Sequence, residues 1–296
     1  MRRTLMLGLA KTVLRAAGVD TTAAYQNLSR RSIQAALREQ GLDALCDDLR
    51  RVVPDLRDQY TAGFDPVEYE RLWEVKMRGL HAWQTRFVLD ALEMIGGEGL
   101  VLADIGDSSG NHAAYVAALA PPGRVARTVS VNLDPVAVQK VRAKGMEAVQ
   151  CRAEELDLED LRPDLFLSFE MVEHLTDPVR FLHALATRGS AEYLVMTVPY
   201  RRHSRFGGHH LRLPEDTMPG GMTAEEVHVF EFSLDDWGLL ARFAGFRPVQ
   251  TRIYRQYPLR GPLRATAPLW RKLDFEGFAG YLLRRDLAVA NKYADW

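Results

Sequence analysis

The sequence has almost no cysteine and no long apolar run. Cys46 and Cys151 are the only cysteines in 296 residues, and their spacing matches neither a metal-binding nor a redox motif. We therefore expect no disulfide framework and a reducing, cytoplasmic setting. No stretch approaches the roughly 20 apolar residues that cross a bilayer. The apolar run at residues 5–10 is also too short for a usual signal peptide.

An excess of charge is missing as well, because 38 basic residues face 39 acidic ones and the net charge is −1 at pH 7. Such a chain has no overall field that gathers nucleic acid or anionic membrane. Residues 1–19 carry four basic and no acidic side chains. That composition is typical of a helix in peripheral contact with a membrane or a partner, but more often of an exposed charged face. The basic C-terminal part lacks the aromatic pattern of a known RNA module, so nucleic-acid binding is not expected.

Two regions of different periodicity divide the chain. Residues 1–95 are predicted to form a helical N-terminal cap, with Leu80, Trp83, Phe87, Ala91 and Met94 recurring at helical spacing. This stripe is expected to pack against a core, the alternative being that it lines a pocket. Residues 96–296 are predicted to form one doubly wound α/β domain with a mostly parallel, seven-stranded, Rossmann-like sheet.

The expected strands are at residues 100–105, 128–133, 148–151, 165–169 and 193–198, with helices at 112–119, 135–144 and 178–187 between them. A helix at 234–244 and strands at 247–253 and 286–291 complete the sheet. Residues 200–225 have no period and many turn formers, so we expect an irregular insertion and a candidate lid. The histidines and arginines of this insertion suit an anionic or sugar-like substrate, or simply a solvated loop. They are His203, His209, His210, Arg201, Arg202, Arg205 and Arg212.

The segment from Val101 to Gly110 places an apolar strand directly before a turn of small residues and a helix. Small residues let a ligand approach the backbone, and a helix N-terminus offers N–H groups to an anionic part of that ligand. A nucleoside is expected at this edge of a parallel sheet. A nicotinamide dinucleotide is not, because Ser108 and Asn111 occupy two glycine positions of the G-x-G-x-x-G pattern and no clear acidic residue ends the second strand.

These residues resemble the class I S-adenosylmethionine-dependent methyltransferases, in the small-molecule branch that includes ubiquinone-biosynthesis O-methyltransferases. The resemblance covers about residues 80–255. Asp104, Gly106 and Gly110 match the acidic-x-Gly-x-Gly-x-Gly motif, while Ser108 replaces the middle glycine and Asp107 stands where a small residue is common.

Later segments match the same family in the expected order. Asn132 stands where the family has an acid that holds the ribose hydroxyls, and Asp134 is a less favoured substitute. Residues 168–175, Val-Pro at 198–199 and Ala-Gly-Phe at 244–246 match further family segments. The resemblance implies S-adenosylmethionine as cofactor, surrounded by Asp104, Gly106, Asp107, Gly110, Asn132, Ala153 and Glu154, with Phe169 packing nearby.

The candidate catalytic residues are Glu173, His174 and His228. Glu170, Glu173 and His174 have the spacing i, i+3, i+4, which places them on one side of a helical turn after the fourth strand. This pattern with a distant histidine also resembles the divalent-metal site of ubiquinone-pathway and small-RNA 2′-O-methyltransferases, where the metal polarises the acceptor hydroxyl. A metal is not the favoured interpretation. The alternatives are a general-base role and a structural or substrate-orienting role.

The sequence therefore predicts a methyltransferase that acts on an oxygen of a small-molecule or sugar-like acceptor. An RNA 2′-O-methyltransferase is the alternative within enzymes. A non-catalytic scaffold of the same fold is the alternative outside them, because the middle glycine and the second-strand acid are missing. Neither the acceptor nor an oligomeric state is specified by the sequence.

Overall fold

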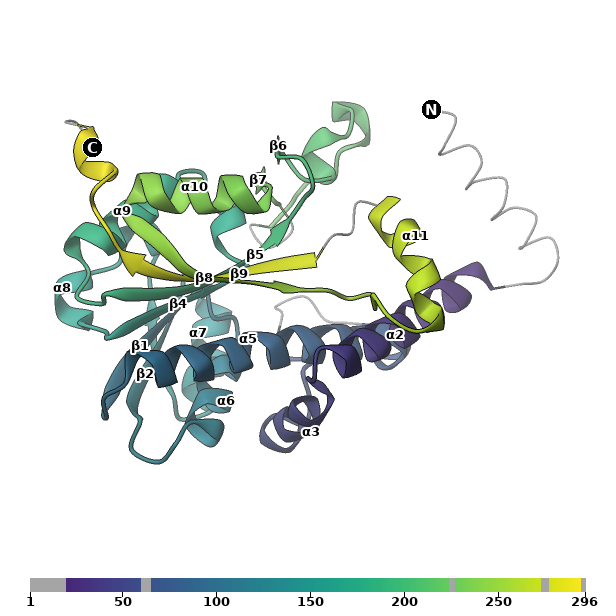
Figure 1. Ribbon diagram of the computed structural model, residues 1–296, viewed down its shortest axis with the longest axis horizontal. Helices are drawn as coiled ribbons and strands as arrows, with labels where there is room; N and C mark the ends of the chain where they lie inside the picture. Colours follow the sequence, from purple (N-terminus) through teal and green to yellow (C-terminus); the bar gives the residue numbers. More distant parts are fainter. Residues whose placement is uncertain (1–19, 60–64, 224–226, 273–276, 294–296) are drawn as a thin grey trace.

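The computed structural model describes residues 20–59, 65–223, 227–272 and 277–293. Figure 1 shows a central sheet with helices on both faces. The basic segment 1–19, for which a surface or partner role was considered, lies outside the described residues. Among the helices of the described residues, none is long and apolar enough to cross a membrane.

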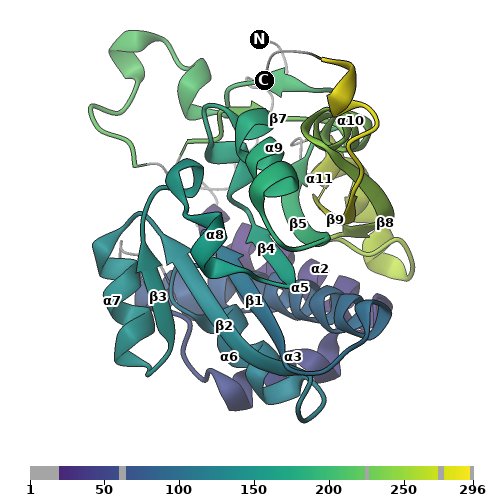
Figure 2. The same cartoon turned by 90° about the vertical axis from the view of Figure 1, so that its left-hand side faces the viewer.

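The central sheet has seven strands in the order β3-β2-β1-β4-β5-β9-β8 (Figure 2). Only β9 runs antiparallel to its neighbours, and the other strands are parallel to one another. The predicted mostly parallel seven-stranded fold is therefore confirmed. The strands are β1 Leu100–Ile105, β2 Val125–Asn132, β3 Glu147–Gln150, β4 Leu165–Phe169, β5 Tyr193–Tyr200, β8 Phe246–Tyr254 and β9 Gly277–Arg285.

The last strand was predicted at the wrong place. The strand is Gly277–Arg285, whereas residues 286–291 form turns that lead into the short 3-10 helix Ala290–Lys292. Glycine inside a strand weakens the sequence signal, but Gly280 has a packing reason to be there. It pairs with Thr197 of β5, and a Cβ atom on it would lie 2.8 Å from the Phe87 ring and 2.9 Å from the Trp83 ring.

Alternating side chains of the strands divide the core into two layers. On one face Leu100 and Leu102 of β1 pack with α5 (Glu74–Ile95) and α6 (Asn111–Leu119). On the other face Ala103 and Ile105 pack with α9 (Pro178–Arg188) and α10 (Leu234–Ala244). Because side chains alternate along a strand, Asp104 points to the side of α5 and α6. Helices α7 (Pro135–Ala143) and α8 (Leu158–Leu161) complete the crossovers.

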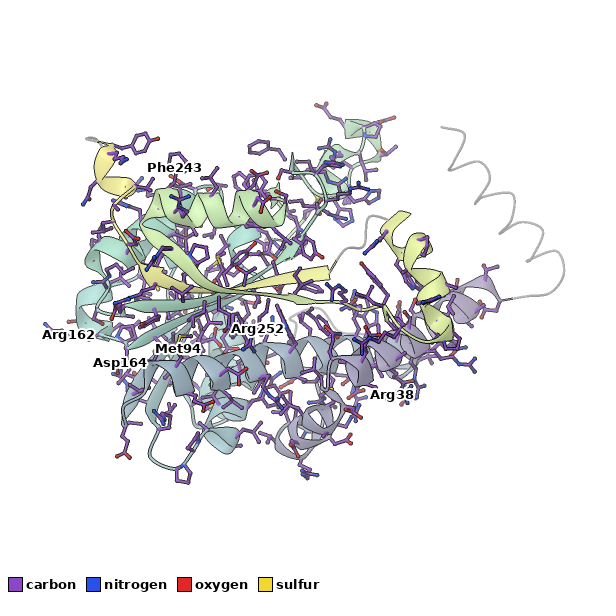
Figure 3. The ribbon with its side chains drawn as sticks, viewed as in Figure 1. Arg38, Met94, Arg162, Asp164, Phe243 and Arg252 are labelled. Carbon is purple, nitrogen blue, oxygen red and sulfur yellow. The ribbon has the colours of Figure 1, made fainter. Side chains whose placement is uncertain are left out.

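The chain before the sheet is helical, with α2 Thr21–Glu39, α3 Asp43–Val52, α4 Pro66–Glu68 and a π-helical turn Tyr69–Trp73 preceding α5. The aromatic stripe of α5 is buried at Trp83 and Phe87, as its spacing predicts, whereas Met94 is 51% exposed near the end of the helix (Figure 3). The fully buried Arg78 donates to Tyr115 Oη, at 3.0 Å, and to the carbonyl of Leu49. This guanidinium joins α3, α5 and α6.

The segment between β5 and α10 contains a two-stranded ribbon, β6 (Arg205–Phe206) with β7 (Phe230–Glu231), and two 3-10 turns, His210–Arg212 and Glu215–Thr217. Helix α10 then begins after Ser233, whose hydroxyl accepts from the backbone N–H of Asp236. The remaining elements are the 3-10 helices Ala153–Glu155, Val172–His174 and Pro262–Thr266, and the helix α11 Ala267–Lys272.

We expect Gly280→Ala to destabilise the protein by about 1–3 kcal/mol, because the new methyl group has no room between β9 and α5. Thermal unfolding should show a loss of about 2–4 °C for each kcal/mol. The matched control is Gly238→Ala in α10, where a Cβ atom would meet Pro248 at an ordinary 3.8 Å. That variant should gain about 0.5–1 kcal/mol. Equal melting temperatures for Gly280→Ala and the wild type would contradict this packing argument.

Candidate active site

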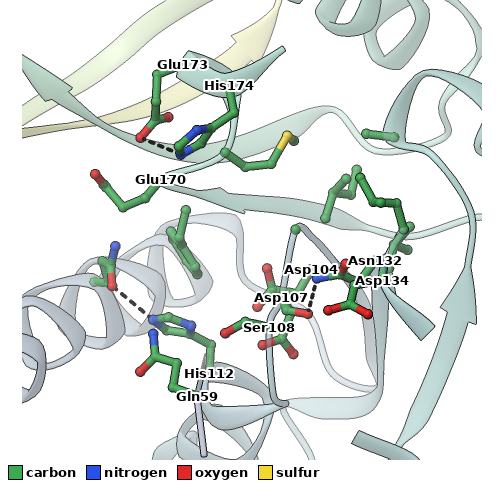
Figure 4. A pocket seen from close by; sticks show the side chains of 18 of the residues that line it. Gln59, Asp104, Asp107, Ser108, His112, Asn132, Asp134, Glu170, Glu173 and His174 are labelled. Carbon is green, nitrogen blue, oxygen red and sulfur yellow. Dashed lines mark hydrogen bonds and ion pairs between the residues drawn. The ribbon is translucent and has the colours of Figure 1, made fainter. Parts of the chain in front are cut away.

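One cavity of about 640 Å³ lies at the carboxyl ends of β1, β2 and β4, within the size range of small-molecule sites (Figure 4). It brings together ten of the eleven residues expected from the sequence, namely Asp104, Gly106, Asp107, Asn132, Ala153, Glu154, Phe169, Glu173, His174 and His228. The exception is Gly110, which is not among the residues that line the cavity. Its φ of +76° and its position at the start of α6 give it a role in the turn instead.

The loop between β1 and α6 is held by its own carboxylate. Asp107 accepts hydrogen bonds from the backbone N–H of Gly110 at 2.9 Å, from that of Ser109 at 3.3 Å and from the hydroxyl of Ser130 at 2.6 Å. The donors before α6 that were expected to meet an anionic part of the ligand therefore already bind an anion of the chain. This arrangement disfavours a phosphate ligand at this turn.

Asn132 connects β2 to the same loop. Its side-chain amide donates to the carbonyl of Asp107 at 3.0 Å, and its Oδ1 accepts from the backbone N–H of Asp134 at 2.8 Å. Asp134, the less favoured substitute, caps α7 by accepting from Val136 N–H. Asn132 thus lines the cavity and also fixes the loop beside it. The second role depends on a contact with Asp107, 25 positions earlier in the chain, so no local sequence pattern indicates it.

Asp104 is the buried carboxyl group at this end of the cavity. Only 1% of it is exposed, and its Oδ2 has no hydrogen-bond partner among the described residues. Burial, and then the nearby Asp107, raise the pKa of Asp104 well above its usual range. A ligand with a positive or donor group would satisfy this oxygen.

The second group of cavity residues follows β4 (Figure 4). Glu170 adopts a φ of +50°, uncommon for a residue with a side chain, and Val172–His174 forms a 3-10 turn. Glu173 is fully buried, and neither of its carboxylate oxygens has a hydrogen-bond partner among the described residues, although Oε1 lies 3.8 Å from His174 Nε2 (Figure 4). Burial raises the pKa of Glu173 to about 7. Glu170, Glu173 and His174, which have the spacing i, i+3, i+4, all line the cavity, although Glu170 lies before the turn and not within it.

The two candidate histidines lie beside each other, with ring centroids 4.9 Å apart. His174 Nδ1 lies 2.8 Å from the carbonyl of Val227, so this nitrogen carries the proton and donates. His228 Nδ1 lies 3.4 Å from a carboxylate oxygen of Glu231. Both contacts leave Nε2 as the acceptor nitrogen of a neutral imidazole.

Glu231 was not identified from the sequence. Burial raises its pKa, but hydrogen bonds from His228, Arg201 and Arg205 outweigh burial and lower the pKa of Glu231 to about 2. Glu231 is therefore ionised at neutral pH and orients His228. Arg201 and Arg205, expected in a substrate-binding lid, hold this carboxylate instead.

A third group of polar side chains in the cavity comes from α5 and α6 and was also missed. His112 Nε2–H donates to Gln84 Oε1 at 3.0 Å, and Gln84 Nε2 donates to the hydroxyl of Thr197 at 2.9 Å. Burial lowers the pKa of His112 to about 3, and burial followed by the nearby His112 lowers that of His81. Both imidazoles are thus neutral. Polar residues at 81 and 84 within the apolar stripe were the available sequence signal.

Comparison with known proteins agrees with this geometry. Residues 103–187 match the family model of a methyltransferase domain. No curated protein matches the chain in sequence. Among solved structures, a chain of the complex between the Haloferax volcanii Trm112 methyltransferase activator and its candidate methyltransferase aligns with a TM-score of 0.51 and 16% identity. The alignment covers 78% of this chain and 98% of that one. The Burkholderia thailandensis 1,6-didemethyltoxoflavin-N1-methyltransferase, with 1,6-didemethyltoxoflavin and S-adenosylhomocysteine bound, aligns with a TM-score of 0.47 and 17% identity over 77% of this chain and 93% of its own.

The sheet order and the crevice beside β1 define a Rossmann-like domain of the methyltransferase type. The matched residues run from β1 through α9 and include the cofactor loop. The chain therefore contains a class I S-adenosylmethionine-dependent methyltransferase domain, and the predictions of this class of enzyme and of its cofactor are confirmed.

We expect Asp104→Asn to stabilise the ligand-free protein increasingly as the pH rises. The folded-state pKa of Asp104 is raised, so its contribution to stability is fully present below the unfolded pKa of about 4 and is lost as the pH rises through the folded pKa. Asparagine cannot ionise and escapes this loss. Thermal unfolding of both proteins at pH 5 and pH 8 measures the difference.

Asp107→Asn is the matched control, because Asp107 accepts three hydrogen bonds inside the loop. The substitution replaces the Oδ2 acceptor of the Ser130 hydroxyl by an NH2 group and removes the charge that strengthens the bonds from Ser109 and Gly110 N–H, so it should cost about 1–3 kcal/mol. A pH-independent difference for Asp104→Asn, or stabilisation by Asp107→Asn, would contradict the assigned roles.

Proposed function

We propose that the protein transfers the methyl group of S-adenosylmethionine to a hydroxyl oxygen of a small-molecule or sugar-like acceptor. The observation that carries the proposal is that one cavity contains both the cofactor-loop residues and the pair His174 and His228. We further propose the cytoplasm as its setting, in keeping with two free cysteines.

The charges of the cavity support a cationic methyl donor. Carboxylate oxygens of Asp104, Glu170 and Glu173 are buried there without hydrogen-bond partners among the described residues. A buried carboxylate without hydrogen bonds raises the free energy of the ligand-free protein, and a positive ligand relieves that cost. S-adenosylmethionine carries an ammonium group and a sulfonium. We assign the ammonium to Asp104, with Gly106, Asn132, Ala153 and Glu154 along the rest of the cofactor and Phe169 packing nearby.

When bound, the cofactor supplies a sulfonium methyl group that needs no activation by the protein. The residues of the chain then have to orient the acceptor oxygen and accept its proton, and a positioned base contributes about 10²–10⁴-fold. We assign the base to His228, because Glu231 fixes its Nδ1 and Nε2 is the accepting nitrogen. An ionised carboxylate that orients a histidine also stabilises the imidazolium formed after proton transfer. His174 and Glu173 are assigned to positioning the hydroxyl.

A second chemistry at the same place is metal-assisted transfer. Glu173, His174 and His228 each offer one ligand atom, and these atoms lie within 4.8 Å of one another. The carboxylate oxygens of Glu173, which lack hydrogen bonds among the described residues, and the Nδ1 contact of His174 to a backbone carbonyl fit a divalent cation, because metal-binding histidines donate their other N–H in this way. Such an ion would lower the pKa of the acceptor hydroxyl. We keep this as the second candidate.

The cofactor assignment is tested by calorimetric titration with S-adenosylhomocysteine. We expect saturable binding to the wild type, and an affinity at least tenfold lower for Asp104→Asn because the ammonium loses its carboxylate. Asp160→Asn, at an exposed position of α8, should bind like the wild type. Absence of binding at millimolar ligand would favour the scaffold alternative and refute the proposal.

The base and metal chemistries are separated by comparing His228→Gln with chelation of the wild type. With labelled S-adenosylmethionine and a metabolite extract, His228→Gln should reduce methyl transfer by about 10²–10⁴-fold and leave S-adenosylhomocysteine affinity unchanged. The wild-type rate should stay within about twofold after EDTA treatment. A rate abolished by EDTA and restored by Mn²⁺ would replace the base assignment with the metal one. Label in RNA rather than in a metabolite would overturn the acceptor class.

A further inference from the structure

A second, smaller cavity of about 140 Å³ adjoins the large one on the side away from the cofactor loop. Lys76 and Gln256 line both cavities, so they stand where the two meet. The remaining walls of the small cavity come from α2, the π-helical turn and α11, through Tyr25, Ser29, Ile33, Leu72 and Trp270. A buried water molecule needs only about 10–15 Å³ of such cavity volume. The small cavity therefore has room for a functional group and several atoms of its stem.

Two buried polar atoms at this cavity lack protein partners. Gln256 is 4% exposed and Ser29 is 7% exposed, and neither Gln256 Nε2 nor Ser29 Oγ has a hydrogen-bond partner among the described residues. Leaving a buried donor unsatisfied costs about 1–3 kcal/mol. Gln256 Nε2 is a donor and the Ser29 hydroxyl can donate, so one partner with acceptor oxygens satisfies both.

Gln256 is held in place by α2. The hydroxyl of Ser32 donates to the carbonyl of Gln256 at 3.4 Å, and Gln40 both donates to the carbonyl of Arg255 at 2.9 Å and accepts from its N–H at 3.2 Å. The carboxylate of Glu39 accepts from the N–H groups of Leu259 and Arg260. The segment after β8 is thus fixed from both sides of Gln256, as in a preformed binding site.

Lys76 adds a positive charge at the junction of the cavities. Its ammonium lies 4.4 Å from the ring centroid of Trp73, and burial lowers the pKa of Lys76 to about 8. Among the described residues that line the small cavity, Lys76 is the only charged one. One cation, one amide and one hydroxyl match a monoanion with two acceptor oxygens, whereas a phosphate dianion would leave a buried charge uncompensated.

We propose that the small cavity binds a carboxylate of the methyl acceptor, with Lys76, Gln256 and Ser29 as donors, while the hydroxyl to be methylated lies near His228. This inference rests on the proposed function and names its substrate class: a hydroxy acid. The rings of Tyr25 and Trp270, which meet edge to face with centroids 5.8 Å apart, add apolar surface beside the carboxylate stem.

The test uses a homologous series of ω-(4-hydroxyphenyl)alkanoates, each paired with its uncharged amide of the same length. Calorimetric titration is made with and without saturating S-adenosylhomocysteine. At one or two adjacent chain lengths, the acid should bind at least tenfold more tightly than its amide. In Lys76→Met, which keeps a long apolar side chain, this ratio should fall below twofold. Gln256→Leu should reduce it in part.

The control is Lys292→Met, an exposed lysine far along the sequence, which should keep the wild-type ratio. Thermal unfolding verifies that Lys76→Met is folded. Equal binding of acid and amide at every length, or a ratio that persists in Lys76→Met, would overturn the inference, and so would tighter binding of matched phosphate monoesters. Because the ratio needs no turnover and is also measured without the cofactor product, failure of the methyltransferase proposal is seen separately, as absent S-adenosylhomocysteine binding.

Discussion

The site depends on carboxylates that the fold buries at the ends of β1 and β4 without hydrogen bonds to Asp104 Oδ2 or to either oxygen of Glu173 among the described residues. Asp104 ends up on the helix-covered side of β1 because side chains alternate along the strand, and Glu173 is fully buried in the turn after β4. Burial raises the pKa of both. The protein satisfies the neighbouring Asp107 with its own backbone instead. The cavity is therefore selective for charge: it lacks an anion site at the helix N-terminus and favours a cationic donor.

Helix α5 links the stability of the domain to the shape of the site. Trp83 and Phe87 pack so closely on β9 that only glycine fits opposite them at position 280. The same helix carries Gln84, which lines the cavity with His112 and is held by hydrogen bonds to His112 and Thr197. Figure 1 shows α5 running along the whole sheet. A shift of this helix would move core and site together, so the tight packing also fixes the polar groups that face the ligand.

The sequence predicts those features that depend on the pattern of neighbouring residues along the chain. The strands at 100–105 and 165–169 have the observed bounds because apolar residues end abruptly in turn formers there. The gathering of site residues follows from parallel strands that end at one edge. The strand at Gly277–Arg285 was missed because Gly280 makes sense only opposite the α5 rings, and Gly277 only against the backbone of Tyr254. Likewise the pairing of Glu231 with His228, and of Asn132 with the first loop, depends on contacts between distant segments. Local pattern carries no signal for these.

The charged side chains that line the two cavities differ in sign, and this difference sets the orientation of the bound acceptor. Most charged residues at the donor end are carboxylates, with Arg152 beside them, and among the described lining residues Lys76 is the cation at the junction with the small cavity. A hydroxy acid that entered in reverse would place its carboxylate beside Glu173 and Asp104, where burial already disfavours negative charge. It would also leave Gln256 and Ser29 unpaired. The attraction of the carboxylate to Lys76 and the cost of burying it near Asp104 and Glu173 favour the same orientation of the acceptor. The choice between the two orientations therefore does not depend on attractive contacts alone.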